Sequence, residues 1–288
     1  MLHPVNGGGN PESTSGILRV RLRSLAVEET PMRTILLSLL IIFAASTAAH
    51  AKRWVPPPGT TFEWILQGYR GAIPTAEAID IDLFDTPGSQ VAALRKAGKI
   101  PICYVSVGTW ENWRPDRRDF PQSLLGKPLD NWPGERYLDI RNLTLLGPIL
   151  LARLDLCRAK GFLAVEPDNV DVADNDSGFQ ISKADTLRFL KWLAAMAHNK
   201  GLSIGLKNVP ELSETLAGTF DWALTEDCFD QRFCADSQPF ITAGKAVFAV
   251  EYTDNRINFS KFCQQAKQLG LSPLLKQRNL KEFSQRCP

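Results

Sequence analysis

Histidine is scarce in this chain, and the shortage argues against several kinds of chemistry. The 288 residues contain three histidines, His3, His50 and His198, and only His198 follows the apolar segment near the N-terminus. His198 ends an apolar stretch that is predicted to be helical, where a packing or capping role is expected. A histidine-rich zinc site and a Ser-His-Asp triad are therefore not expected. Because no Cys-x2-Cys spacing occurs either, we expect no metal and no cofactor.

The chain also lacks an excess of one charge and a long hydrophobic run. Residues 1–51 hold four of its 33 basic and three of its 31 acidic side chains, so residues 52–288 are nearly neutral. No basic surface is expected to bind nucleic acid, and no basic run suggests a membrane surface. The apolar run at 35–45 is shorter than the ~20 residues that span a bilayer.

The N-terminal residues have the pattern of a secretory signal peptide. A charged start at Met32-Arg33 precedes the apolar run, and Ala49-His50-Ala51 forms a small-residue cleavage site. Residues 32–51 are therefore predicted to be a signal peptide, with an uncleaved anchor as the alternative. Residues 1–31 are predicted to be disordered or a mis-assigned extension. The domain is expected at 52–288, without a membrane span, in a secreted or periplasmic protein.

All six cysteines follow the predicted signal peptide. An even number of cysteines in an exported chain indicates disulfides. Proximity in the sequence favours the pairs Cys228–Cys234 and Cys263–Cys287, which leaves Cys103–Cys157. Other connectivities remain open at this point.

Short β-rich runs alternate with helical patterns along residues 52–288, as in repeated βα units around a parallel sheet. Strands are predicted at 62–67, 78–84, 100–107, 162–166, 202–207, 222–225, 246–251 and 273–276. Helices are predicted at 89–97, 145–159, 183–199, 211–216, 239–243 and 259–269. A glycine follows most helical runs, where a left-handed residue ends a helix: Gly98, Gly161, Gly201, Gly244 and Gly270. Eight strands and no glycine-rich phosphate loop favour an α/β fold, a single-domain (β/α)8 TIM barrel, over an open doubly wound sheet.

One long excursion, at 109–141, interrupts the alternation. It contains Trp110, Trp113 and Trp132 together with several prolines. Loops of this length in a domain are usually functional, and aromatic rings over a barrel mouth would suit sugar stacking. A structural loop that folds on its own tryptophans is the alternative.

Acidic and polar residues gather at the predicted strand ends, where barrel enzymes hold their catalytic groups. The strand ends carry Asp82, Tyr104, Glu166, Asp168, Asp171, Lys207, Asn208, Glu226, Glu251 and Tyr252. Since residues i and i+2 of a strand share a face, Glu166 and Asp168 are predicted to point the same way. Glu226 and Glu251 each follow an apolar run, at positions where a side chain can line the mouth.

Glycoside hydrolysis needs two carboxyl groups beside the scissile bond, and crowding raises the pKa of one so that it can act as an acid. Several acids at one mouth fit this chemistry. Helix capping or a calcium-like loop remains an alternative for Asp171, Asp174 and Asp176. Retention or inversion depends on the carboxyl separation, which the sequence leaves open.

Six segments, met in order at successive strand ends, resemble glycoside hydrolase family 114. They are Cys103-Tyr-Val-Ser-Val-Gly-Thr-Trp, Glu135-Arg-Tyr-Leu-Asp-Ile-Arg, Val165-Glu-Pro-Asp-Asn-Val-Asp, Gly205-Leu-Lys-Asn, Thr225-Glu-Asp-Cys-Phe and Val250-Glu-Tyr. The resemblance covers residues 54–288. The type activity of that family is endo-α-1,4-polygalactosaminidase.

The resemblance implies a barrel that hydrolyses an α-1,4-linked galactosamine-containing polysaccharide. Asp168 would be the nucleophile and Glu226 the acid/base. The expected substrate contacts or pKa-tuning groups are Asp82, Tyr104, Glu166, Asp171, Lys207, Asn208, Glu251 and Tyr252. A surplus of acids at the mouth would attract a cationic amino-sugar polymer, the expected partner. A carbohydrate-binding barrel without turnover, or a hydrolase of another amino-sugar polymer, are the alternatives.

Overall fold

A computed structural model describes residues 53–130 and 132–288. The predicted extension at 1–31 and signal peptide at 32–51 lie outside these residues. Each of the eight predicted strands is present, with bounds within two residues of the expectation. They are β1 (Phe62–Ile65), β2 (Ala78–Asp82), β3 (Ile100–Ser106), β7 (Ala164–Asp168), β8 (Ser203–Lys207), β9 (Trp222–Glu226), β10 (Val247–Tyr252) and β11 (Ser272–Lys276).

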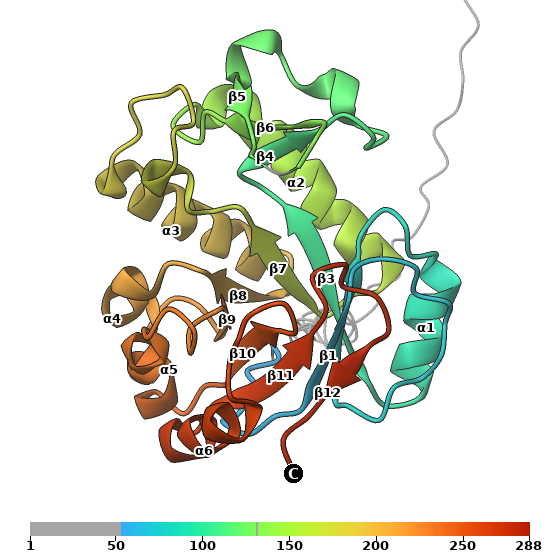
Figure 1. Cartoon of the computed structure of the whole chain (residues 1–288). Helices are drawn as coiled ribbons and strands as arrows, with labels where there is room; N and C mark the ends of the chain where they lie inside the picture. Colours follow the sequence, from blue (N-terminus) through green and yellow to red (C-terminus); the bar gives the residue numbers. More distant parts are fainter. Residues whose placement is uncertain (1–52, 131) are drawn as a thin grey trace, which may run out of the picture. The chain divides into compact units, whose positions relative to one another are not determined.

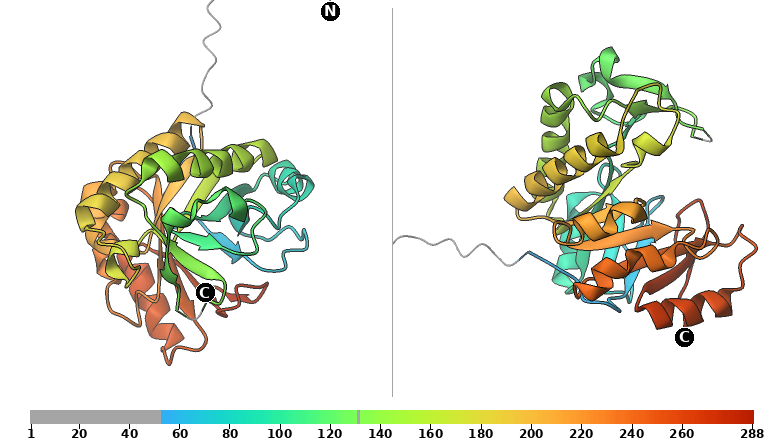
Figure 2. Two further views of the ribbon diagram at one scale, coloured as in Figure 1. Left: turned by 90° about the horizontal axis from the view of Figure 1, so that it is seen from above. Right: turned by 90° about the vertical axis from the view of Figure 1, so that its left-hand side faces the viewer.

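These strands are parallel neighbours in the order β1-β2-β3-β7-β8-β9-β10-β11, and helices surround them (Figures 1 and 2). The helices are α1 (Gly88–Lys96), α2 (Leu143–Lys160), α3 (Lys183–Asn199), α4 (Ser213–Leu216), α5 (Gln238–Thr242) and α6 (Phe259–Leu269). Short 3-10 turns add η3 (Val172–Asp174), η4 (Pro210–Leu212) and η5 (Cys234–Ser237). The predicted helix at 211–216 is thus divided between η4 and α4. All five glycines expected after helices have positive φ.

The sheet is nearly closed, and the segment after β11 bridges its seam. The short strand β12 (Ser284–Gln285) pairs antiparallel with β11. On the other side, the Leu280 carbonyl accepts hydrogen bonds from Leu66 N at 2.9 Å and Gln67 N at 3.2 Å. The (β/α)8 barrel is confirmed, with this segment completing its wall. No helix in the described part of the chain is long and apolar enough to cross a membrane.

Alternation along the strands separates a barrel interior from the layer beneath the helices. The lower interior is apolar and aromatic, with Phe62 stacked on Phe248 at 4.3 Å between ring centroids. Gly205 makes room there, because a Cβ at this position would lie 2.4 Å from the Trp222 ring. The interior positions nearer the carboxyl ends carry polar side chains instead, and these form the floor of the site.

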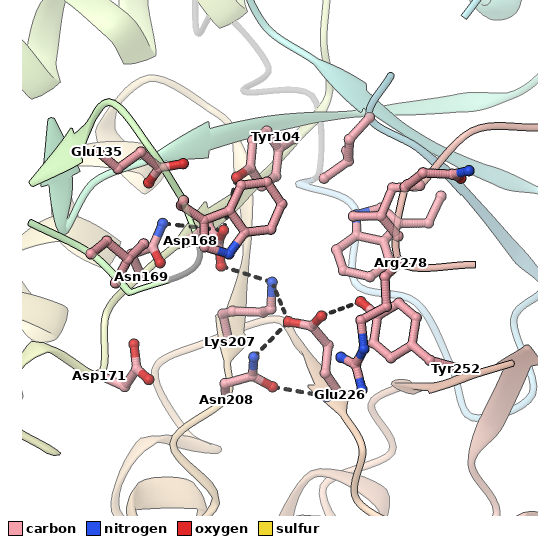
Figure 3. Close-up of a pocket in the computed structure, with 16 residues that line it drawn as sticks. Tyr104, Glu135, Asp168, Asn169, Asp171, Lys207, Asn208, Glu226, Tyr252 and Arg278 are labelled. Atoms are coloured by element: carbon pink, nitrogen blue, oxygen red, sulfur yellow. Dashed lines mark hydrogen bonds and ion pairs between the residues drawn. The ribbon is translucent and has the colours of Figure 1, made fainter. Parts of the chain in front are cut away.

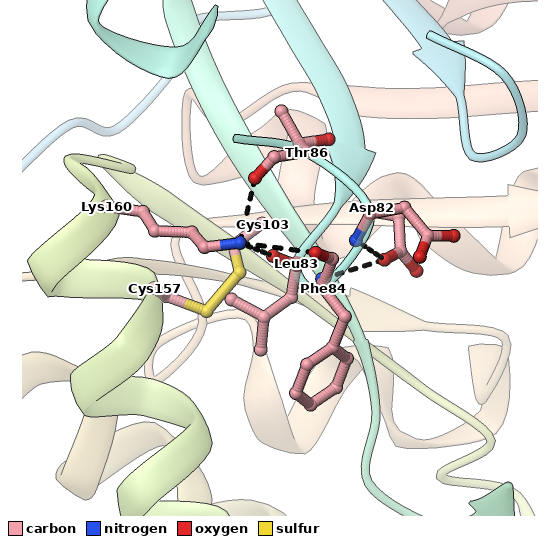
Figure 4. Close-up of a disulfide and its surroundings, with 8 residues drawn as sticks. Asp82, Leu83, Phe84, Thr86, Cys103, Cys157 and Lys160 are labelled. Atoms are coloured by element: carbon pink, nitrogen blue, oxygen red, sulfur yellow. Dashed lines mark hydrogen bonds between the residues drawn. A yellow bond between two sulfur atoms is a disulfide. The ribbon is translucent and has the colours of Figure 1, made fainter. Parts of the chain in front are cut away.

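Three disulfides are present, and they are the predicted pairs: Cys103–Cys157, Cys228–Cys234 and Cys263–Cys287. The first joins β3 to α2 outside the barrel (Figure 4). Beside it, Lys160 Nζ donates to the carbonyls of Leu83 at 2.6 Å and Thr86 at 2.8 Å. The disulfide holds α2 against β3, and this lysine holds it against the loop that follows β2.

The excursion at 109–141 forms a second small sheet beyond the carboxyl end of β3 (Figure 1). Its strands are β4 (Thr109–Glu111), β5 (Leu125–Pro128) and β6 (Glu135–Leu138), with turns η1 (Arg117–Asp119) and η2 (Gln122–Leu124). Trp110 packs on the core, and its Nε1 donates to the Arg117 carbonyl at 2.9 Å. Trp113 and Trp132 are about half exposed and line cavities. Trp110 thus has the structural role that was the alternative, whereas sugar stacking on Trp113 and Trp132 stays a prediction.

Candidate active site

A cavity of about 740 Å³ opens at the carboxyl ends of the barrel strands. Its lining includes Asp168 from β7, Lys207 from β8, Glu226 from β9 and Tyr252 from β10. These side chains point inward because each shares the phase of the strand alternation with interior residues below it, such as Trp222 below Glu226 and Phe248 below Tyr252. Strands that are adjacent in the barrel therefore bring together residues that are far apart in the sequence.

Lys207 lies at the centre of this cavity, between the two predicted catalytic acids (Figure 3). Its Nζ is 2.8 Å from Asp168 Oδ1, 2.8 Å from Glu166 Oε1 and 3.1 Å from Glu226 Oε2. The side chain is 2% exposed. Burial would lower the pKa of Lys207, but the three carboxylates raise it well above its usual range. Lys207 is therefore a permanent cation that fixes the positions of all three acids.

Asp168 is held in its ionised form. Besides Lys207, the Tyr104 hydroxyl donates to Oδ2 of Asp168 at 2.8 Å. Burial acts to raise the pKa of Asp168, but Lys207 and the Tyr104 hydrogen bond lower it below its usual value. An ionised carboxylate with fixed geometry suits a nucleophile.

Glu226 faces the cavity with a different set of partners. Asn208 Nδ2 donates to its Oε2 at 2.7 Å, and the Tyr252 hydroxyl donates to its Oε1. The Glu226 side chain is 23% exposed, so it is accessible to a molecule in the cavity. Burial and the Glu226 carboxylate raise the pKa of Tyr252 well above its usual range, which keeps the phenol a donor.

A further pair of acids, Asp80 and Glu166, lies below the cavity floor, and both are 0% exposed. Glu166 Oε2 accepts from Trp64 Nε1 at 2.8 Å. Neither oxygen of Asp80 receives a hydrogen bond within the described part of the chain. Burial and the nearby Glu166 raise the pKa of Asp80 well above its usual range. This raised pKa favours the neutral form of Asp80 beside Glu166.

Left-handed residues directly follow three of these strand ends. Asn169, Asn208 and Asp227 have φ values of 58°, 45° and 56°. Such backbone is uncommon for residues other than glycine, although Asn and Asp tolerate it. The conformation interrupts the alternation, so Asn169 lines the cavity next to Asp168, and Asn208 next to Lys207. Two successive side chains from one strand end thereby face the same space.

Glu251 lies elsewhere than expected. It is 0% exposed, its Oε1 accepts from Phe229 N at 2.7 Å, and it does not line the cavity. Its neighbour Tyr252 occupies the inward phase of β10, so Glu251 must point outward, beneath the helices. The prediction that Glu251 lines the mouth is therefore corrected.

Three other predicted residues lie at the edges of the site. Asp82 faces an adjoining cavity, where Arg114 binds both of its oxygens at 2.9 and 2.7 Å. Glu166 is covered by Lys207 and Trp64, so it supports the floor without reaching the cavity. Asp171 lines the cavity, and burial raises its pKa.

Asp176 instead pairs with Lys127 on the surface, at 2.6 Å. No cluster of three potential metal ligands occurs in residues 53–130 and 132–288.

Several residues of the cavity were not predicted from the sequence. They are Trp64, Leu66, Leu129, Glu135, Asn169, Arg278, Asn279 and Leu280. Trp64 stands near the end of β1 and could have been found by the same reasoning as Asp168. Glu135 lies in the excursion, and burial raises its pKa to about 7. Arg278 follows β11, pairs with Asp227 at 3.1 Å and covers the Tyr252 ring at 4.1 Å.

Comparison with known proteins agrees with this geometry. The model of glycoside hydrolase family GH114 matches residues 43–288. The crystal structure of Aspergillus fumigatus Ega3 in complex with galactosamine is 37% identical, with a TM-score of 0.75, over 81% of this chain and 97% of that one. The glycoside hydrolase domain of PelA from Pseudomonas aeruginosa shares the fold, at 14% identity and a TM-score of 0.62, over 80% of this chain and 98% of that one.

An uncharacterised protein of Deinococcus radiodurans is 27% identical over 232 residues, which cover 71% of this chain and 74% of that protein. The family match extends over the whole barrel and includes every strand end that contributes to the cavity. The chain therefore belongs to glycoside hydrolase family GH114 and is a glycoside hydrolase.

Proposed function

We propose that this protein is an exported endo-acting hydrolase of an α-1,4-linked, galactosamine-containing polysaccharide. The observation that carries the proposal is the convergence of Asp168 and Glu226 on Lys207 at the floor of the cavity. Two carboxyl groups in fixed positions are what glycosidic bond hydrolysis requires. The bound galactosamine in the related Ega3 structure supports the choice of sugar.

The charge of the cavity supports a cationic substrate. Glu135, Asp171 and Glu226 line it together with Asp168, whose charge Lys207 already compensates in part. An amino sugar without an acetyl group carries an ammonium at neutral pH, and a cavity with excess carboxylates attracts it. Arg278 is the other cation of the lining, and Asp227 and Asp254 hold it at the rim.

In the proposed mechanism, Asp168 attacks the anomeric carbon and the bond to the leaving oxygen breaks, while Glu226, which must be protonated in the substrate complex, donates its proton to that oxygen. Lys207 and Tyr104 keep Asp168 ionised until substrate arrives. Glu226 then deprotonates a water that cleaves the glycosyl-enzyme bond. Three disulfides are typical of an oxidising compartment, which supports export.

The test of this function is hydrolysis of α-1,4-linked galactosamine polymer by the full chain. We expect new reducing ends, with chain length falling early in the reaction because cleavage is internal. A matched α-1,4-glucan, which has the linkage without the ammonium, should be cleaved far more slowly. Retardation of the protein by the polymer in affinity electrophoresis without any cleavage would contradict the proposal.

The carboxyl separation predicts the stereochemistry. Asp168 Oδ1 and Glu226 Oε2 lie 2.8 and 3.1 Å from one nitrogen, so these oxygens are no farther apart than the sum of those distances. For these nearest oxygens the limit lies below the carboxyl separation of about 6.5–9.5 Å in inverting enzymes and is compatible with about 5–5.5 Å, so we propose a retaining reaction. We expect the first product to keep the α configuration, as measured by proton NMR during early turnover. A β-anomer as first product would show that water attacks directly.

A further inference from the structure

A second cavity of about 380 Å³ adjoins the catalytic one. The two share lining residues, among them Tyr104, Trp132 and Glu135, so they form one continuous depression. The second cavity extends away from Asp168 and Glu226, over the end of β2 and under the excursion. Its volume is in the range of ordinary small-molecule sites, about 300–1,000 Å³.

The second cavity has more negative charge than its own cation can balance. Asp82, Asp85, Glu111 and Glu135 line it, and among the residues that the structure describes Arg114 is the one cation in its lining. Arg114 is fully engaged, because Asp82 takes both terminal nitrogens and Glu111 Oε1 accepts from Nε at 2.8 Å. The acids that remain can serve a cationic ligand.

Glu111 provides the more specific indication. Its side chain is 3% exposed, and its Oε2 has no hydrogen-bond partner within the described part of the chain. A buried carboxylate oxygen without a donor is costly, at about 1–3 kcal/mol or more for a charged group. A ligand ammonium in this cavity would supply the missing donor.

The rim of the same cavity is aromatic. Trp113 is 48% exposed and Trp132 is 47% exposed, and both contribute to the lining. The apolar C–H face of a sugar ring packs on such a surface, and an indole is the best aromatic partner for a cation. Carboxylates below and indoles above suit a ring that carries an amino group.

We propose that this second cavity is a subsite for another amino-sugar unit of the polymer, with its ammonium on Glu111 and Glu135 and its ring on Trp113. The inference rests on the proposed function and specifies it further. The enzyme would recognise the positive charge of a sugar unit that lies away from the glycosidic bond that it cleaves. A neutral or N-acetylated unit has no positive charge to pair with Glu111 and Glu135 and binds less well.

The experiment compares the full chain with Trp113→Ala and Glu111→Gln on long galactosamine polymer and on its N-acetylated form. Each substitution is expected to raise KM for the cationic polymer about 3- to 10-fold, with little change in kcat, because the subsite binds substrate and transition state alike. On the N-acetylated polymer the Glu111→Gln effect should vanish, whereas the Trp113→Ala effect should remain. Phe283→Ala, an exposed aromatic outside both cavities, and Glu282→Gln, an exposed acid, are the matched controls.

The outcomes separate the two proposals. No cleavage of galactosamine polymer by the unmodified protein would overturn the proposed function and this inference with it. If the unmodified protein cleaves the polymer, and the KM values of Trp113→Ala and Glu111→Gln are within twofold of the KM of the unmodified protein, the subsite proposal alone would be overturned. Because Trp113 is exposed, the Trp113→Ala variant is expected to fold. If Glu111→Gln lowers the melting temperature, the KM of Trp113→Ala still tests the subsite.

Discussion

Asp168→Asn and Glu226→Gln are each expected to reduce kcat on the galactosamine polymer by at least about 10²–10⁴-fold. Both substitutions keep the shape of the side chain and remove its charge and its proton-transfer capacity. An asparagine in place of Asp168 could not form the glycosyl-enzyme bond, and a glutamine in place of Glu226 could neither give nor take the proton. The measurement is the initial rate of reducing-end release, with a thermal melt of each variant to show that it is folded.

Glu251→Gln is the matched control for this pair. Glu251 is also a strand-end acid, but it points outward and accepts a hydrogen bond from Phe229 N. Burial raises its pKa to about 7, so the neutral amide resembles its state near neutral pH. We expect nearly full activity. Activity of Asp168→Asn or Glu226→Gln at the level of Glu251→Gln would contradict the assignment of the catalytic acids.

Lys207→Met is expected to abolish activity and to destabilise the fold by about 3–5 kcal/mol at neutral pH. The substitution leaves Glu166, Asp168 and Glu226 around an apolar side chain with no cation to compensate them. In the unmodified protein the pKa of Asp168 is lowered, so its contribution to stability is present above its unfolded pKa and is lost as pH falls. Without Lys207 the pKa values of these acids rise, so the variant gains stability relative to the unmodified protein as pH falls.

Denaturant unfolding at pH 5 and pH 7.5 measures this difference. Lys276→Met serves as the control, since Lys276 is also a fully buried lysine at a barrel strand end. It pairs with Glu63 at 3.2 Å and does not line the cavity. We expect Lys276→Met to be destabilised but active when folded. A Lys207→Met variant with near-normal kcat would refute the role of this lysine in fixing the carboxylates.

The barrel was predictable because its signals are local. Each inner strand is a short apolar run, and glycines such as Gly161 and Gly270 mark the helix ends that precede the next strand. The pair Glu166 and Asp168 also followed from alternation alone. Alternation alone does not show which of the two faces of a strand points into the barrel. Both Glu251 and Tyr252 were assigned to the site, although they are successive residues within β10 and only one of them can face the barrel interior.

The missed residues depend on chain geometry that no local pattern encodes. Arg278 reaches the cavity because the segment after β11 crosses the barrel seam. Glu135 reaches it because the excursion folds into its own sheet and returns over the mouth. Asn169 lines it because one left-handed residue reverses the expected phase. In each case a tertiary feature, not the composition of the segment, decides where the side chain points.

The left-handed residues after β7, β8 and β9 are also positions where a substitution could stabilise the fold at the expense of activity. Glycine relieves left-handed strain, so Asn169→Gly, Asn208→Gly or Asp227→Gly would remove a local penalty of up to about 1–2 kcal/mol each. Each such change would also delete a hydrogen-bonding side chain beside the catalytic acids. Thermal stability and catalytic turnover are therefore opposed at these three positions. Selection for a more thermostable enzyme is expected to conserve these residues and to change others in the barrel.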